Sequence, residues 1–428
     1  MKYVAWLAST LSTLLLLLPG GAMAAPPVPE AAKPLSQLAI YAVKGPPDSC
    51  GPGCDRWIAI EGKIEKGSAA KVERFFRERK DTQLPIYFHS PGGEMRDSLA
   101  IGRLLRSRKA VGRVGRTVVD ACPGTQTDDA CTFIKTTRDE VTGTVATRGA
   151  VCGSACTFLL FGAATREVAL DAAVAVHGPK IGIEFRLNMN EKYREEATAK
   201  AHGEADRLAF AYVAEMGISR ELITLADSIS HESIRVLTRD ELHRFQIDTR
   251  DFVETPWTFE KTPRASSVRK IALTKIGGAF RKLEWQFSCD NRAQTRLMFA
   301  DEVGKDAVGT RVVAMTAGAA KPPQFARFPA RVGGYEIWTA ALSTEQMKSF
   351  FAVPRLGVGQ SALLADGKAD KSSFIEIETR GLEAAWTQLS ANCVAPVRPP
   401  AVRWPTPPVH PAPSPQVSEG LPPRPATK

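Results

Sequence analysis

In the N-terminal part of the chain, short segments with the apolar pattern of strands take turns with segments that have the apolar spacing of helices. RWIAIEGKI (Arg56–Ile64) and LPIYFH (Leu84–His89) have the short apolar pattern of strands, and Ala110–Val114 predicts a third. SAAKVERFFRER (Ser68–Arg79) and Glu94–Arg108 repeat apolar residues every three or four positions, as one-sided helices do. Strand, helix, strand, helix, strand predicts an α/β fold with right-handed βαβ crossovers and a mostly parallel sheet.

Thr117–Arg148 interrupts this pattern with a polar segment that contains Cys122 and Cys131. We interpret it as an inserted loop, either a lid over a site or an inert surface insertion. The pattern then resumes with a helical stretch at Thr157–Gly162 and a strand at Ala172–Val176.

The next segment is predicted to be mainly helical. Asn190–Met216 indicates a long helix, and Ile218–Ala226 a second one after Gly217. IRVLTRDELHRFQID (Ile234–Asp248) predicts a strand followed by a helix with a Thr238/Glu241 capping box.

Beyond a proline-containing boundary at 248–267, strand patterns recur and one amphipathic helix is predicted at Gly381–Ser390. The chain is therefore divided into a signal peptide (1–24), a flexible leader (25–45), an α/β domain (46–255), a small β-rich domain (268–394) and a proline-rich disordered tail (395–428). The tail is either a spacer or a ligand for a partner protein.

Composition and charge narrow the functional classes. The 428 residues are 44% hydrophobic and 24% charged, with a net charge of +10. The basic residues are scattered among acidic ones, which argues against nucleic-acid binding. No phosphate-binding GxxxxGK[ST] loop or matched set of metal ligands is present, so we expect no cofactor and no metal.

The N-terminus has the pattern of an export signal. Lys2 precedes an apolar run centred on Leu14–Leu18, and Ala22-Met23-Ala24 fits a cleavage site. The alternative is an uncleaved membrane anchor, but Pro19 breaks the run and it is short for a membrane span. We expect a periplasmic or secreted protein with no integral membrane segment after signal removal.

Eight cysteines in an exported chain suggest disulfides. We expect the pairs Cys50–Cys54, Cys122–Cys131 and Cys289–Cys393, although connectivity does not follow from sequence. Cys152 and Cys156 could pair with each other or with the insertion, or remain buried as thiols.

The strongest chemical pattern lies at Gly149–Pro179. Ser154 precedes an apolar helix, and the next strand ends at His177. A serine at a helix start and a histidine at a strand end can form a nucleophile–base pair, with helix-start N–H groups for an oxyanion. On its own, the same pattern is better explained by tight helix–sheet packing and a hydrogen-bonded histidine at the end of a strand.

Three stretches together resemble the ClpP/crotonase-like superfamily, in particular the proteolytic subunit of Clp proteases. They are IYFHSPGGEMRDSLAIGRLL from Ile86, GAVCGSACTFLLFGAATREVALDAAVAVHGP from Gly149, and SIRVLTRDELHRFQID from Ser233. The resemblance implies Ser154 as nucleophile and His177 as general base. It also implies an oxyanion hole formed by Gly92 or Gly93 with Ala155.

The family's triad aspartate is missing from the corresponding place, where Ser233 and Ile234 stand. Glu232 and Asp227 are nearby acids that could replace it, and a Ser–His dyad is the remaining option.

Two functions follow from these features. The first is an exported, ATP-independent serine endopeptidase that acts on peptides or unfolded proteins. The second is a catalytically inactive envelope protein that keeps the fold for binding or assembly. A crotonase-type acyl-CoA enzyme is a third, weaker alternative because coenzyme A is not expected outside the cytoplasm. Clp relatives form rings, so the resemblance also implies a homo-oligomer.

Overall fold

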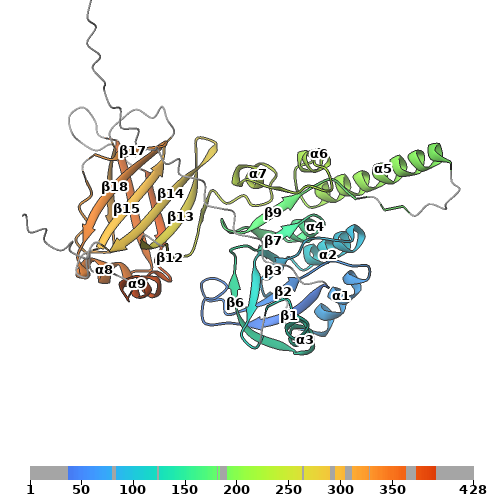
Figure 1. The fold of residues 1–428 in the computed structure, drawn as a ribbon, viewed down its shortest axis with the longest axis horizontal. Helices are drawn as coiled ribbons and strands as arrows, with labels where there is room; N and C mark the ends of the chain where they lie inside the picture. Colours follow the sequence, from blue (N-terminus) through green and yellow to red (C-terminus); the bar gives the residue numbers. More distant parts are fainter. Residues whose placement is uncertain are drawn as a thin grey trace, which may run out of the picture.

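The computed structural model describes residues 37–79, 83–122, 125–180, 182–183, 190–262, 265–289, 295–303, 311–326, 328–362 and 373–391. Predicted segments 1–24 and 395–428 lie outside these residues. The described chain is mixed α/β (Figure 1), and its buried apolar side chains form separate clusters within residues 38–247 and 257–389.

The largest sheet of the N-terminal part has the strand order β5-β6-β1-β2-β3-β4-β8. Strands β2, β3, β4 and β8 are parallel to their neighbours in that run, whereas β1–β2 and β5–β6 are antiparallel. Across the whole described molecule the sheets are mainly mixed or antiparallel, so a mostly parallel sheet is not confirmed. The strands are β1 (Ala39–Lys44), β2 (Arg56–Glu61), β3 (Ile86–His89), β4 (Val111–Val114), β5 (Arg116–Val119), β6 (Glu140–Ala146) and β8 (Thr165–Glu167).

Strand β1 corrects the prediction of a flexible leader through residue 45. Its residues AIYAVK are buried up to Val43 because β1 lies inside the sheet, between β2 and β6. A prediction based on the neighbouring proline-rich sequence missed these partners, one of which is far away in the chain.

Helices α1 (Ser68–Glu78), α2 (Met95–Ser107) and α4 (Cys156–Gly162) lie close to the predicted ranges. Their buried residues, such as Val72, Leu105 and Leu160, join one apolar cluster with the sheet. Helices α2 and α4 approach closely at Gly102 and Gly162, where a side chain on Gly162 would collide with the Gly102 backbone. This packing fixes the helix that follows Ser154 against the rest of the core.

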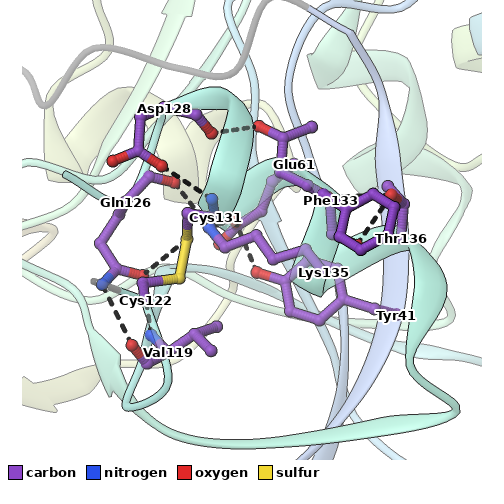
Figure 2. Close-up of a disulfide and its surroundings, with 11 residues drawn as sticks. Tyr41, Glu61, Val119, Cys122, Gln126, Asp128, Cys131, Phe133, Lys135 and Thr136 are labelled. Atoms are coloured by element: carbon purple, nitrogen blue, oxygen red, sulfur yellow. Dashed lines mark hydrogen bonds and ion pairs between the residues drawn. A yellow bond between two sulfur atoms is a disulfide. The ribbon is translucent and has the colours of Figure 1, made fainter. Parts of the chain in front are cut away.

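The interpretation of 117–148 as an inserted loop is wrong. The segment contains β5, helix α3 (Asp129–Thr137) and β6, and β5 and β6 pair with each other. Figure 2 shows how α3 is attached: it carries Cys131, bonded to Cys122, and the buried Lys135. The Lys135 Nζ donates to Glu61, which also accepts from Tyr41. The buried ion pair therefore secures α3 to the sheet.

A small sheet with the order β10-β9-β7 carries the candidate site. Strands β7 (Val151–Gly153) and β9 (Ala173–Val176) are parallel, and β10 (Arg235–Val236) is antiparallel to β9. Beside it lie α5 (Glu191–Glu215), α6 (Glu221–Asp227) and α7 (Arg239–Arg244). The predicted Thr238/Glu241 capping box of α7 is confirmed.

The described residues of the C-terminal part form antiparallel strands and two short helices (Figure 1). Trp285, Phe299 and Trp338 are direct cross-strand neighbours and fill its core. Its elements are β11 (Phe252–Glu254), β12 (Thr258–Lys261), β13 (Ser266–Ile276), β14 (Ala279–Cys289), β15 (Thr295–Glu302), β16 (Arg311–Thr316), β17 (Ala330–Val332), β18 (Tyr335–Leu342), α8 (Thr344–Phe351), β19 (Arg355–Ala362), β20 (Ser373–Glu378) and α9 (Leu382–Ala391).

The predicted disulfides Cys50–Cys54 and Cys122–Cys131 are confirmed, and Cys152 bonds to Cys156. Cys289 is also disulfide-bonded, while its predicted partner Cys393 lies outside the described residues. None of the helices in the described ranges is long and apolar enough to cross a membrane.

Candidate functional site

Ser154 stands on a sharp turn between β7 and α4. Its φ of 53° is left-handed, a conformation that costs a residue with a side chain about 1–2 kcal/mol. The turn is held on both sides: the Ser154 N–H donates to Ala175 O in β9 at 2.8 Å, and Thr157 Oγ1 donates to Ser154 O at 2.7 Å. Such a turn directs a side chain out of the sheet at the start of a helix.

The Ser90-Pro91-Gly92-Gly93 loop passes directly against this turn. Gly92 and Gly93 have φ values of 100° and 142°, which only glycine adopts without strain. A Cβ atom on Gly92 would lie 2.7 Å from Ser154 Cβ and 2.8 Å from Ala155 N. The loop can therefore approach the serine only because Gly92 lacks a side chain.

Two backbone N–H groups at this contact are available to a ligand. The Gly92 N–H donates to Ser90 Oγ at 3.1 Å and is already used. For the N–H groups of Gly93 and Ala155, the described part of the chain supplies no acceptor. Of the two predicted glycines, Gly93 is thus the one that offers a donor together with Ala155.

His177 follows directly after β9, the strand whose Ala175 carbonyl accepts the Ser154 N–H. Its Nδ1 lies 2.7 Å from Gly178 O. A carbonyl oxygen only accepts, so in the neutral imidazole this contact places the proton on Nδ1 and leaves Nε2 with a free lone pair. This is the tautomer that a general base requires.

Ser154 and His177 line one cavity of about 350 Å³ together with Gly93 and Ala155. Its other lining residues are Glu94, Met95, Thr157, Phe158, Phe161, Val176, Gly178, Pro179, Lys180, Ala205, Asp206, Ala209, Leu222, Ile223, Ala226 and Asp227. Helices α4, α5 and α6 contribute most of the apolar wall, which therefore faces the serine.

The structure separates the two acids predicted as replacements for the triad aspartate. Both residues are exposed, but Asp227 lines the cavity and Glu232 does not. The pKa of Asp227 is raised from its ordinary value by burial and by the nearby Asp206 carboxylate, against a smaller lowering effect of His202. The only hydrogen bond of the His177 ring found among the described residues goes to Gly178, so neither acid orients it here.

Sequence reasoning missed the residues that shape the cavity away from the serine. Phe158 and Phe161 were visible only as apolar positions of a helix. Asp206 lies on α5, whose sequence gives no sign of which face meets the site. Within the described ranges, no group of three or more His, Cys, Asp or Glu residues could hold a metal ion.

Comparisons with known proteins add a weak structural neighbour. No family model matches the chain. No curated protein matches it either. Among solved structures, it is similar to a mutant of a protein described as 1510-N membrane-bound stomatin-specific protease, with 13% sequence identity and a TM-score of 0.26. The match covers 44% of this chain and 73% of that one.

Proposed function

We propose that this protein is a serine peptidase with a ClpP/crotonase-like catalytic domain and that Ser154 forms an acyl-enzyme. The observation that supports the proposal is the convergence of four groups on one cavity: Ser154, His177, and the N–H groups of Gly93 and Ala155. They come from three segments of the fold: Gly93 from the glycine loop, Ser154 and Ala155 from the turn before α4, and His177 from the end of β9. Together they supply a nucleophile, a base and two oxyanion donors for acyl transfer.

In the proposed reaction, His177 Nε2 takes the proton from Ser154 Oγ as the oxygen attacks the peptide carbonyl carbon. The carbonyl oxygen becomes negative and accepts hydrogen bonds from Gly93 and Ala155. His177 then gives its proton to the leaving amine, and the C–N bond breaks. Water, activated by the same imidazole, hydrolyses the ester and restores the serine.

The apolar wall of the cavity supports a peptide or unfolded protein as substrate. A cavity of about 350 Å³ can receive a large side chain, and Phe158, Phe161 and Met95 would contact it. Burying such a side chain contributes about 1.5–3 kcal/mol to binding. We infer that an apolar substrate residue occupies this cavity while the adjacent carbonyl reaches Ser154.

The disulfides are compatible with an oxidising compartment, and we propose export to the periplasm or beyond. There an unfolding ATPase would lack its nucleotide, so the substrate is short or already unfolded. A homo-oligomeric assembly is part of the same proposal, through the resemblance to Clp subunits.

One observation favours the alternative of a catalytically inactive binding protein. His177 has a backbone carbonyl as its ring partner in place of a carboxylate. A carbonyl fixes the tautomer but carries no full negative charge, so it stabilises an imidazolium less than a carboxylate does. In that alternative the cavity binds an apolar peptide segment without cleaving it.

Labelling with a fluorophosphonate probe separates the two functions. We expect the oxidised wild-type protein to be labelled at Ser154, and labelling to be lost in Ser154→Ala and His177→Ala variants whose circular dichroism is unchanged. Hydrolysis of unfolded protein should follow the same pattern. A folded, oxidised wild type that is not labelled would contradict the peptidase and leave the binding protein.

A further inference from the structure

The Cys152–Cys156 disulfide spans the serine turn. Cys152 belongs to β7 and Cys156 is the first residue of α4, with Ser154 midway between them. Both cysteines are fully buried. The bond therefore closes the backbone on the two sides of the residue that has the left-handed φ of 53°.

A left-handed residue other than glycine persists only where its surroundings enforce it. The bond from the Ser154 N–H to Ala175 O in β9 and the bond from Thr157 Oγ1 to Ser154 O also hold this conformation, but both are non-covalent. The disulfide, in contrast, is a covalent link. It ties the start of α4 to β7 on the two sides of Ser154 and so restricts how far this turn can open.

The same strand holds the glycine loop. Cys152 forms an isolated parallel bridge with Ser90, in which Ser90 N donates to Val151 O at 2.8 Å and Gly153 N donates to Ser90 O at 3.0 Å. The Ser90 hydroxyl in turn accepts the Gly92 N–H. A shift of β7 relative to α4 would thus change the positions of Ser154 and of the Gly93 and Ala155 N–H groups together.

We propose that the Cys152–Cys156 disulfide is a positioning device for Ser154 and the oxyanion donors, and that the site is competent only when this bond is formed. The proposal rests on the proposed peptidase function. Reduction by a dithiol would break the S–S bond with two electrons and two protons, leaving two cysteine thiols and a cyclic disulfide of the reductant. Activity would then depend on the redox state of the compartment.

The chain offers a matched control. Cys50–Cys54 has the same sequence separation of 4, but none of the residues between its two cysteines lines the cavity, whereas Ser154 and Ala155 lie between Cys152 and Cys156. We would compare Cys152→Ala/Cys156→Ala with Cys50→Ala/Cys54→Ala, in both cases measuring the second-order rate constant of fluorophosphonate labelling. Circular dichroism reports the fold, and hydrogen exchange reports the amides of 153–157.

The expected result is a loss of about 100-fold in labelling rate for the Cys152/Cys156 variant, with circular dichroism unchanged and faster exchange at 153–157. The Cys50/Cys54 variant should be labelled at the wild-type rate. Labelling of the Cys152/Cys156 variant at the wild-type rate would overturn the proposal.

Failure of the peptidase function gives a different result, namely no labelling of the wild type. Hydrogen exchange then decides the positioning role: faster exchange at 153–157 in the Cys152/Cys156 variant supports it, and unchanged exchange overturns it.

Should the Cys152/Cys156 variant not fold, wild-type protein would be treated with dithiothreitol for increasing times and alkylated. The fraction labelled must then fall with the fraction of Cys152–Cys156 reduced, and labelling that survives full reduction of this pair overturns the proposal.

Discussion

Gly92 and Ser154 are in such close contact that a Cβ atom on the glycine would lie 2.7 Å from the Cβ of the serine. The same atom would lie 2.6 Å from Gly153 O. Two segments separated by about sixty residues of sequence thus meet without space for a methyl group, and the site between them depends on that fit.

A Gly92→Ala substitution should therefore lower the rate of Ser154 labelling by about 100-fold, because the loop and the Ala155 N–H must move apart. Gly53→Ala is the control: Gly53 also has a left-handed φ, 69°, but nothing lies within 4 Å of its Cβ position. Equal labelling of the two variants would show that the Gly92 contact has no influence on the serine.

Asp227→Asn and Glu232→Gln test whether an acid completes a triad. Since the His177 ring contacts Gly178 O and neither acid, we expect both variants to keep labelling rates within about one order of magnitude of wild type. Removing an acid that orients the histidine would cost about 10⁴-fold. A loss of that size in one variant would identify the third member.

Lys135→Met should destabilise the N-terminal part by about 3 kcal/mol, because it leaves the Glu61 carboxylate buried without its cation. Denaturant unfolding followed by a probe in this part would measure the change. The control is Arg77→Met, which removes an exposed ion pair with Glu73 and should cost less than about 1 kcal/mol. Similar losses in the two variants would contradict the structural role of Lys135.

The buried carboxylate of Asp248 should make the stability of the protein depend on pH in the acidic range. Burial raises the pKa of this carboxyl, but hydrogen bonds from Arg250 and Arg239 outweigh burial and hold the pKa well below its ordinary value. The charged form is thus favoured by folding, and its stabilisation is complete above the unfolded pKa, about 3.9, and is lost as the pH falls further.

We therefore expect Asp248→Asn to lower the free energy of unfolding by about 3 kcal/mol at pH 7. The difference from wild type should shrink at pH values below about 4. Urea unfolding of both proteins across this pH range would measure it, and a difference that stays constant would show that the Asp248 charge is not responsible.

The sequence pattern predicted best where structure is local. Helix α1 was expected at Ser68–Arg79 and spans Ser68–Glu78, because Val72 and Phe76 lie one turn apart on its buried face. The α7 capping box was likewise visible, since its two residues are close in sequence. Disulfides Cys50–Cys54 and Cys122–Cys131 also join neighbours in the chain.

The pattern failed where pairing partners are distant. Strand β6 pairs with β1, a segment far earlier in the chain. The polar, cysteine-containing segment around β6 favoured an inserted loop, although its residues EVTGTVA alternate between buried and exposed positions. The candidate site shows the same limit. Ser154 and His177 follow from a motif, whereas Asp206 reaches the cavity only through the packing of α5.

The position of β1 also affects how the chain can fold during its synthesis. Ala42 and Val43 pair with Glu140 and Val141, so one edge of β1 stays open until the ribosome has released β6. Strand β2 can protect only the other edge. For that interval a nascent chain presents the apolar sequence AIYAVK as an unpaired edge, the kind of surface that chaperones cover and that nucleates aggregation.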